Sequence, residues 1–272
     1  MDYKVLEKTA ADVRVGVIKA IAAAGSGHPG GSLSAADIVT ALYFHEMNID
    51  PENPKMKERD KFVLSKGHAG PVQYAALALR GYFPKESILG LRKLGGKFQG
   101  HPDMNKVPGI EMSTGSLGQG FAAAAGMAMA NQLDRNPGRV YVLIGDGELQ
   151  EGMIWETAMS APNYKLDNLV AIIDWNGLQI DGRNEDVMSV SPIDDKFAAF
   201  GWNVLIINGH SFPEIMDAFE KARACKGKPT VIIAKTEKGH GVSFMADNAG
   251  WHGKAPNAEE TERAIAELGG EF

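Results

Sequence analysis

The feature that most constrains the fold of this chain is an alternation of short apolar runs and helical stretches in its second half. The run Val140–Ile144 is followed by a helical pattern over 151–161 and then by a second apolar run, Leu169–Ile173. The same order returns further along the chain, in Asn203–Ile207, 213–226 and Thr230–Ala234. Strands that are apolar on both faces and separated by helices form a parallel sheet with helices on both sides. The sequence therefore predicts an α/β fold of three layers with a mainly parallel central sheet.

The first half of the chain adds helices and one short strand to this scheme. Apolar residues at helical spacing predict a helix over about 4–24 that ends at Gly25. We expect a glycine-rich loop after it, and Ser34 can then cap a helix over about 35–47. Asn257 and Glu260 form a capping-box pattern that predicts a last helix near the C-terminus. The remaining predictions are a strand at 62–64 and helices over 71–80, 85–93 and 117–133.

Composition limits the classes of function. The 272 residues contain no internal repeat or low-complexity linker, so we expect a single domain over 1–272. The net charge of −6 argues against a broad attraction to nucleic acid or anionic membranes. The single cysteine, Cys225, excludes an intrachain disulfide and favours a reducing compartment. Without a signal-peptide pattern or about 20 consecutive apolar residues, the sequence predicts a cytoplasmic protein with no nucleic-acid or membrane partner.

A glycine-rich segment near the N-terminus fits the letters of a dinucleotide site. Gly25–Gly30 matches G-x-G-x-x-G, a pattern that needs a strand before it and a helix that opens inside it. Here the preceding segment has helical periodicity, and Pro29 stands where the phosphate-binding helix should begin. We therefore exclude a nicotinamide-dependent dehydrogenase. A loop that only ended the helix would leave His28 unexplained.

Polar residues follow two of the predicted strands at the point where each strand ends. The segment 145–147 (Gly-Asp-Gly) comes directly after the first apolar run, and Asn176 comes shortly after the second. Ligands of open parallel sheets bind at the carboxyl ends of strands, so Asp146 and Asn176 can converge. A carboxylate, an amide oxygen and a nearby backbone carbonyl suit octahedral Mg²⁺ completed by phosphate oxygens and water. Each segment alone would favour a simple turn, whereas the pair favours a metal site.

These two segments resemble the thiamine-diphosphate signature of transketolases and their relatives. Further segments are similar to the transketolase branch of that family and occur in the same order. They are SGHPG with His28, FVLSKGHA with His68, GHPD with His101, STGSLGQG over 113–120, GDGELQEG over 145–152, NGLQIDG over 176–182 and WHG with His252. The similarity extends over nearly all 272 residues. It implies a thiamine diphosphate-binding domain of transketolase type, with Mg²⁺ as the metal and Ca²⁺ or Mn²⁺ as substitutes.

The resemblance also implies roles for individual residues at the cofactor. Asp146, Asn176 and the backbone carbonyl of Leu178 would ligate the metal that bridges the diphosphate. The other implied contacts are Gly147, His68 and His252 at the diphosphate, Gly115 and Leu117 near the rings, and Ile180 against the thiazolium.

Histidines would serve the substrate in this scheme. The resemblance places His28, His101 and His252 along the substrate channel. Transfer of a two-carbon ketol unit moves protons at hydroxyl and carbonyl oxygens near neutral pH, where imidazole is effective. His45, His210 and His240 lack this support, and we expect structural roles for them.

Two glutamates, and two residues that depart from the family pattern, lie in or beside these segments. Glu151 and Glu156 fit ordinary glutamates near a helix N-terminus, whereas the resemblance places both in a carboxylate relay that joins two cofactors at the contact between subunits. Ser116 stands where many relatives have proline, and Trp175 where they have a smaller polar residue. Neither supplies a metal ligand, so these departures affect only the contour of the cofactor pocket.

The resemblance finally predicts what the chain needs from a partner. In transketolases, the carboxylate that activates the aminopyrimidine ring and the residues that grip the sugar phosphate lie in a second, pyrimidine-binding domain. We expect that domain and the C-terminal domain to be absent here and to be carried by a partner subunit, in an α2β2 heterotetramer. A truncated form of a longer enzyme is the alternative.

The implied activity is transfer of a two-carbon ketol unit from a ketose phosphate to an aldose phosphate, as in the pentose phosphate pathway. One alternative is the same chemistry on a sulfo-sugar or a branched sugar phosphate. Another is a non-catalytic cofactor-binding subunit, against which the retained channel histidines argue.

Overall fold

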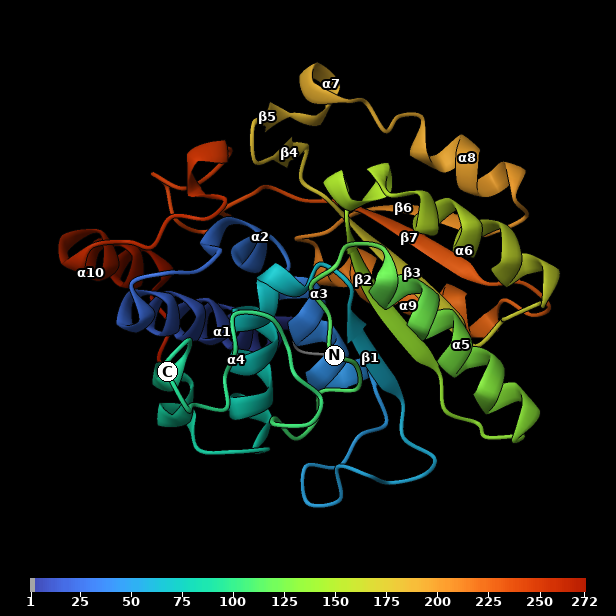
Figure 1. Cartoon of the computed structure of the whole chain (residues 1–272), viewed down its shortest axis with the longest axis horizontal. Helices are drawn as coiled ribbons and strands as arrows, with labels where there is room; N and C mark the ends of the chain where they lie inside the picture. The colour runs from blue at the N-terminus through green and yellow to red at the C-terminus, as the bar shows by residue number, and fades with distance from the viewer. Residues whose placement is uncertain (1–2) are drawn as a thin grey trace.

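A five-stranded parallel sheet forms the centre of the molecule (Figure 1). The structure, a computed structural model, describes residues 3–272. The strands are β1 (Lys61–Leu64), β2 (Val140–Gly145), β3 (Leu169–Trp175), β6 (Asn203–Asn208) and β7 (Thr230–Lys235), in the order β1-β2-β3-β7-β6. All neighbouring strands run parallel, so their carboxyl ends meet at one edge of the sheet. The predicted α/β fold with a parallel sheet is confirmed.

Helices cover both faces of the sheet. Alternate side chains of each central strand point to opposite faces, and those on both faces are apolar. On β2, Tyr141 and Leu143 pack into one hydrophobic cluster, and Val142 and Ile144 pack into another on the opposite face. The first cluster joins the sheet to α1 (Tyr3–Ala24), α2 (Pro29–Ser34), α3 (Ala36–Ala41), α4 (Gly70–Arg80), α9 (Phe212–Ala224) and α10 (Ala258–Leu268). The second joins it to α5 (Gln119–Leu133), α6 (Gly152–Asn163) and α8 (Ile193–Ala199). The three predicted layers are therefore present.

Local signals set several helix ends. Asn257 Oδ1 accepts a hydrogen bond from Glu260 N at 2.8 Å, and Glu260 Oε2 accepts one from Asn257 N at 2.8 Å, so the predicted capping box opens α10. Helix α4 ends at Gly81, whose φ of +97° is accessible to glycine at little cost. Among the helices of residues 3–272, none combines the length and the apolar character that crossing a membrane requires.

The segment after α1 differs from the prediction of a loop and a cap at Ser34. Pro29 opens helix α2, because the fixed φ of proline suits the first helical position. Ser34 is the last residue of α2 and does not act as a cap; its hydroxyl instead donates to Asp174 Oδ2 at 2.6 Å. The helix predicted over 35–47 is α3 followed by a π-helical turn, Leu42–Glu46. A tertiary hydrogen bond thus outweighs the local signal.

Short elements near the carboxyl edge of the sheet were not predicted. Strand β4 (Leu178–Gln179) pairs with β5 (Gly182–Arg183) in an antiparallel hairpin, which helix α7 (Asn184–Val187) follows.

Several 3₁₀ turns also lie along the chain. The helix predicted over 85–93 is one of them, Lys85–Gly90, and the others are Gly67–Ala69, Gly147–Gln150 and Ala249–Trp251. These elements are too short to carry a periodic apolar pattern.

Candidate active site

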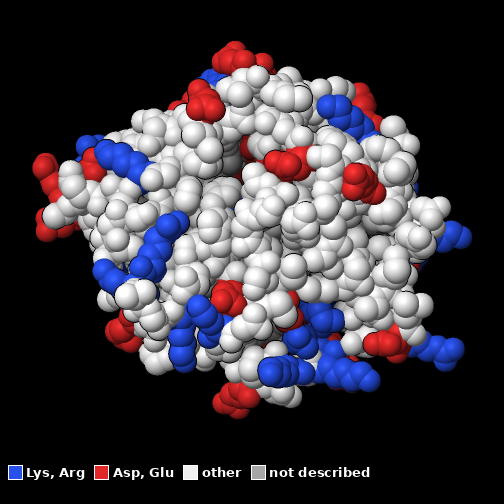
Figure 2. All heavy atoms as spheres, in the orientation of Figure 1, with Lys and Arg blue, Asp and Glu red and all other residues white. Residues whose placement is uncertain are grey.

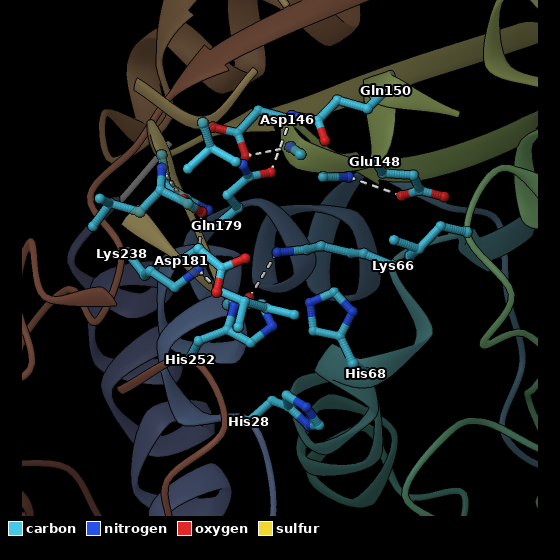
Figure 3. A pocket seen from close by; sticks show the side chains of 18 of the residues that line it. His28, Lys66, His68, Asp146, Glu148, Gln150, Gln179, Asp181, Lys238 and His252 are labelled. Carbon is cyan, nitrogen blue, oxygen red and sulfur yellow. Dashed lines mark hydrogen bonds between the residues drawn. The ribbon is translucent and has the colours of Figure 1, made fainter. Parts of the chain in front are cut away.

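A cavity of about 430 Å³ opens where β1, β2, β3 and β7 end. Figure 2 shows it as a hollow in a largely uncharged part of the surface, and Figure 3 shows its interior. The predicted site residues that line it are His28, His68, Gly115, Leu117, Asp146, Gly147, Glu151, Asn176, Leu178, Ile180 and His252. His101 and Glu156 are outside the lining. Parallel strands thus bring together segments that are far apart in the sequence.

Asp146 is a buried carboxylate at the end of β2. Its Oδ1 accepts from Gly147 N at 2.8 Å and its Oδ2 accepts from Gly177 N at 2.6 Å, and only 2% of the residue is exposed. Burial, and after it the nearby charge of Asp174, raises the pKa of Asp146 to about 6. A cation beside this carboxylate would compensate for its lost hydration.

Asn176 and Leu178 supply two further oxygen atoms next to Asp146. Asn176 Oδ1 accepts from Leu178 N at 3.1 Å, and its Nδ2 donates to Asp174 Oδ2 at 3.2 Å, which orients the amide. The Leu178 carbonyl accepts from Lys238 Nζ at 3.0 Å. Together with the Asp146 carboxylate, these hard oxygen donors fit Mg²⁺.

Three imidazole rings meet in the same cavity. In Figure 3, His28, His68 and His252 lie close together, and their ring centroids are 5.2 Å (His28–His68), 5.4 Å (His28–His252) and 5.1 Å (His68–His252) apart. Burial and then nearby cations lower the pKa of His28 to about 4 and of His252 to about 3, and hold the pKa of His68 well below its usual value. The rings are neutral at pH 7, so each offers one donor and one acceptor nitrogen.

One of these nitrogen atoms has no hydrogen-bond partner among residues 3–272. Nδ1 of His28 is buried and makes no hydrogen bond to any described residue. A buried polar atom of this kind is costly unless a ligand or water satisfies it. The arrangement of oxygen donors and neutral imidazoles therefore fits a ligand that carries both a metal-bound anion and hydrogen-bonding groups.

Comparison with known protein families agrees with this geometry. Residues 5–271 match the family described as "Transketolase, thiamine diphosphate binding domain". The chain belongs to this family. The resemblance of the sequence segments to transketolases is thereby confirmed.

Several relatives of the transketolase family match along the whole chain. The 6-deoxy-6-sulfo-D-fructose transketolase subunit SqwG of a Clostridium species is 48% identical over 263 residues, which cover 97% of this chain and 96% of that protein. One of the subunits of the apulose-4-phosphate transketolase of Phocaeicola vulgatus is 43% identical over 268 residues, covering 98% and 95%. Human transketolase is also 43% identical, but the matched part is 42% of its length.

Solved transketolase structures share the fold. The structure of transketolase from Campylobacter jejuni superimposes with a TM-score of 0.93 at 35% identity and covers 100% of this chain, which corresponds to 44% of that protein. The structure from Leishmania mexicana gives a TM-score of 0.93 at 31% identity, covering 98% and 41%. The five-stranded sheet and its helices thus have the arrangement of the transketolase fold.

A buried ion pair underlies this transketolase-type site and was not predicted. Lys66 Nζ donates to Asp174 Oδ2 at 2.5 Å and to the Gly31 carbonyl at 2.7 Å, with Lys66 1% and Asp174 0% exposed. Although burial opposes it, the charge of Lys66 keeps the pKa of Asp174 below its usual value. Asp174 also accepts from Ser34 Oγ and Thr236 Oγ1, so it joins four segments beneath the cavity. The only indication of this pair in the sequence is that Asp174 directly follows the apolar run Leu169–Ile173.

Glu148 is a second buried charge that was not predicted. Its Oε1 accepts from Ser65 Oγ at 2.5 Å and from Gly118 N at 2.8 Å, and its Oε2 accepts from Gly145 N at 3.0 Å. These partners lie after β1, before α5 and at the end of β2, so one carboxylate connects three segments that reach the cavity. In the segment GDGELQEG, roles were predicted for Asp146 and Glu151, and none for the glutamate between them.

The remaining predicted residues take different positions around the cavity. His101 is exposed and packs behind Gly115, where an added Cβ would lie 3.2 Å from the imidazole ring. Ile180 is 69% exposed at the tip of the β4–β5 hairpin. Glu151 lines the cavity, whereas Glu156 lies on the exposed side of α6.

The histidines for which we expected structural roles lie outside the cavity lining. His210 Nδ1 is 2.7 Å from Asp37 Oδ2, its Nε2 accepts from Glu237 N at 2.9 Å, and its ring stacks on His240 with centroids 3.6 Å apart. Arg14 also binds Asp37 through both terminal nitrogens. His45 is exposed on the π-helical turn.

Proposed function

We propose that this chain is the diphosphate- and metal-binding subunit of a two-chain transketolase. Its reaction would transfer a two-carbon ketol unit from a ketose phosphate to an aldose phosphate. The observation that carries the proposal is the convergence, in one cavity, of cation-binding oxygens with neutral imidazoles. These come from Asp146, Asn176 and Leu178, and from His28, His68 and His252.

Each part of the cavity has a role in this proposal. The Asp146 carboxylate, Asn176 Oδ1 and the Leu178 carbonyl would hold Mg²⁺, or Ca²⁺ or Mn²⁺ in its place. Thiamine diphosphate, when bound, supplies the electron sink, while the protein orients it. The cofactor contacts would be Gly147, His68 and His252 at the diphosphate, Gly115 and Leu117 near the rings, and Ile180 at the thiazolium.

Proton handling would fall to histidines. His28 and His252 are neutral at pH 7 because burial lowers the pKa of both. His28 would accept a proton from a substrate hydroxyl at one nitrogen while the other donates a hydrogen bond, and His252, whose Nδ1 lies 2.9 Å from Lys238 Nζ, would donate from Nε2 to a substrate oxygen. His101, exposed beside Gly115, would bind the part of the sugar that projects from the cavity.

A partner subunit completes the site in this proposal. We propose that 1–272 is one diphosphate-binding domain, and that the partner brings the pyrimidine-binding domain with the carboxylate that activates the cofactor ring. The names of two relatives support this, because both are described as subunits of transketolases and match nearly end to end. Glu151, at the cavity, and Glu156, on the exposed side of α6, would face the partner in an α2β2 assembly.

Two sets of donor and acceptor sugars are candidates for the substrates. A phosphorylated ketose and aldose of the pentose phosphate pathway are the first candidates. The second candidate is the same transfer on 6-deoxy-6-sulfo-D-fructose or on apulose 4-phosphate, which is favoured by the 48% and 43% identity to relatives named for those substrates. The two candidates differ in the acceptor and donor, and they share the cavity chemistry.

The test of the proposal is removal of the metal-binding carboxylate. Asp146→Ala should abolish thiamine diphosphate binding in the assembled complex, measured by calorimetry with Mg²⁺ present, and should leave the circular dichroism spectrum unchanged. Asp195→Ala on α8 removes an exposed carboxylate outside the cavity and should bind the cofactor normally. Unchanged cofactor affinity in Asp146→Ala would contradict the metal assignment.

A further inference from the structure

Two glutamine side chains join the β4–β5 hairpin to the turn that follows β2. Gln150 Nε2 donates to Gln179 Oε1 at 3.0 Å and to the Met188 carbonyl at 2.8 Å. Gln150 ends the 3₁₀ turn after β2, whereas Gln179 lies in β4 and Met188 follows α7. One amide group therefore holds both ends of the segment 179–188. Both glutamines line the cavity, and Figure 3 shows them in the same part of it as Asp146.

These hydrogen bonds fix the orientation of each amide group. A backbone carbonyl can only accept, so Gln150 must turn its NH₂ group toward Met188. The same NH₂ group meets Gln179, which must therefore present its oxygen there. The NH₂ group of Gln179 is left over, and it makes no hydrogen bond to any residue in the range 3–272. Gln179 thus keeps free N–H donors in a side chain that lines the cavity.

The side chain of Gln179 packs directly on Gly147. A Cβ added to Gly147 would lie 3.3 Å from Gln179 Cβ and 3.4 Å from its Oε1, so the glutamine occupies space that a larger residue at position 147 would need. The backbone of Gln179 is fixed by its pairing with Gly182 in the hairpin. Gly147 is the residue beside which the proposed function places the diphosphate. A free N–H donor therefore lies next to the expected position of an anion.

We propose that Gln179 is a further ligand-binding residue of this site, and that its Nε2 donates a hydrogen bond to a diphosphate oxygen held beside Gly147. This inference rests on the proposed function. A hydrogen bond from a neutral amide to a charged phosphate oxygen is stronger than one between two neutral groups. Gln179 would thereby add a side-chain donor to the diphosphate contacts of Gly147, His68 and His252.

The alternative is that Gln179 only joins the hairpin to Gln150. In that case, a substitution that keeps the acceptor oxygen of Gln179 would be harmless. Breaking the amide bond from the Gln150 side would also weaken diphosphate binding as much as breaking it from the Gln179 side. If Nε2 of Gln179 binds the anion, the two sides differ, and the affinity for the anion separates the two roles.

The experiment measures binding of inorganic pyrophosphate to the complete chain by calorimetry, with saturating Mg²⁺. Gln179→Met removes the donor without adding charge and should weaken binding about tenfold. Gln179→Glu keeps an oxygen for Gln150 but replaces the donor by a charged oxygen that repels the anion, so its loss should be at least as large. Gln150→Met breaks the same amide bond and leaves Nε2 of Gln179 in place, so its effect should stay below about threefold.

A second affinity shows whether the metal ligands survive these changes. Mn²⁺ binding without any anion is followed by the electron paramagnetic resonance signal of free Mn²⁺, and neither Gln179→Met nor Gln179→Glu should weaken it. The inference is overturned if pyrophosphate binds Gln179→Met as it binds wild type, or if Gln150→Met loses as much affinity. A loss of Mn²⁺ affinity in Gln179→Met would overturn it as well, because the metal ligands would then be disturbed.

The proposed function is tested separately by the wild-type chain and by Asp146→Ala. If wild type does not bind pyrophosphate with Mg²⁺, or if Asp146→Ala binds Mn²⁺ as wild type does, the proposed diphosphate and metal site is wrong. If Asp146→Ala abolishes binding while Gln179→Met leaves it unchanged, only the role of Gln179 is wrong.

Discussion

Glu148 offers a quantitative test of how the site is held together. Its carboxylate accepts hydrogen bonds from Ser65 Oγ, Gly118 N and Gly145 N, and 2% of the residue is exposed. Glu148→Gln keeps the shape but replaces one acceptor oxygen by an NH₂ group. If the amide oxygen serves Ser65 and Gly118, the NH₂ faces the N–H of Gly145, and a buried donor is left without an acceptor. Leaving such a group unsatisfied costs about 1–3 kcal/mol.

The expected effect follows from this single lost bond. At about 2 kcal/mol, a domain of this size should lose about 4–8 °C in Tm. The assay is thermal unfolding followed by circular dichroism at pH 7. Glu151→Gln is the matched control, because Glu151 is a nearby exposed glutamate, and its change should stay within about 0.5 kcal/mol.

Acidification gives a second check on Glu148. Burial raises the pKa of this carboxyl, so it takes up a proton at a higher pH than an exposed glutamate does. The native chain therefore binds this proton more tightly than the unfolded chain does, so the difference in Tm between wild type and the non-titrating Glu148→Gln variant should widen as the pH falls below 7. The reasoning is refuted if Glu148→Gln unfolds at the wild-type temperature at pH 7.

Two further predictions concern the histidines. Because burial lowers the pKa of His28 from 6.5 to about 4, the unfolded chain binds a proton that the native chain does not, so stability should fall as the pH drops from about 6.5 to about 4. His28→Asn should show a smaller fall in Tm between pH 7 and pH 5 than wild type, and an equal fall would contradict the assignment. His101→Ala should lower the turnover of the assembled enzyme about 100-fold while changing thiamine diphosphate affinity less than about threefold, because His101 lies outside the cavity lining. A loss of cofactor affinity that accounts for the whole loss of activity would make His101 a cofactor ligand instead.

The sheet could be predicted because its signal is local and repeated. The apolar runs of β2, β3 and β7 place alternate residues in two cores, and no tertiary knowledge is needed to recognise them. The segment between α1 and β1 could not be predicted in the same way. Ser34 has the chemistry of a helix cap, but its hydroxyl bonds Asp174, which is 140 residues away in the sequence. Nothing near Ser34 indicates that partner.

Some residues of the site could be predicted in the same way, and others could not. Asp146 and Asn176 were predicted to converge because the ends of parallel strands share an edge, and both residues line the cavity. Lys66, Glu148 and Lys238 were missed because each owes its position to partners on other segments, such as Gly31, Gly118 and Leu178. A buried charge is visible only when the fold shows which groups pair with it.

The central claim is that this chain holds the diphosphate and metal while a partner activates the cofactor ring. The most direct measurement is proton–deuterium exchange at C2 of the thiazolium of thiamine diphosphate, followed by NMR. With Mg²⁺ and the 272-residue chain alone, exchange should be no faster than for the free cofactor, because the proposed function assigns the activating carboxylate to the partner. Adding the partner chain in a 1:1 ratio should produce fast exchange together with tight binding and ketol transfer. Fast exchange by the isolated chain would contradict the account, since a residue of this chain would then perform the activation.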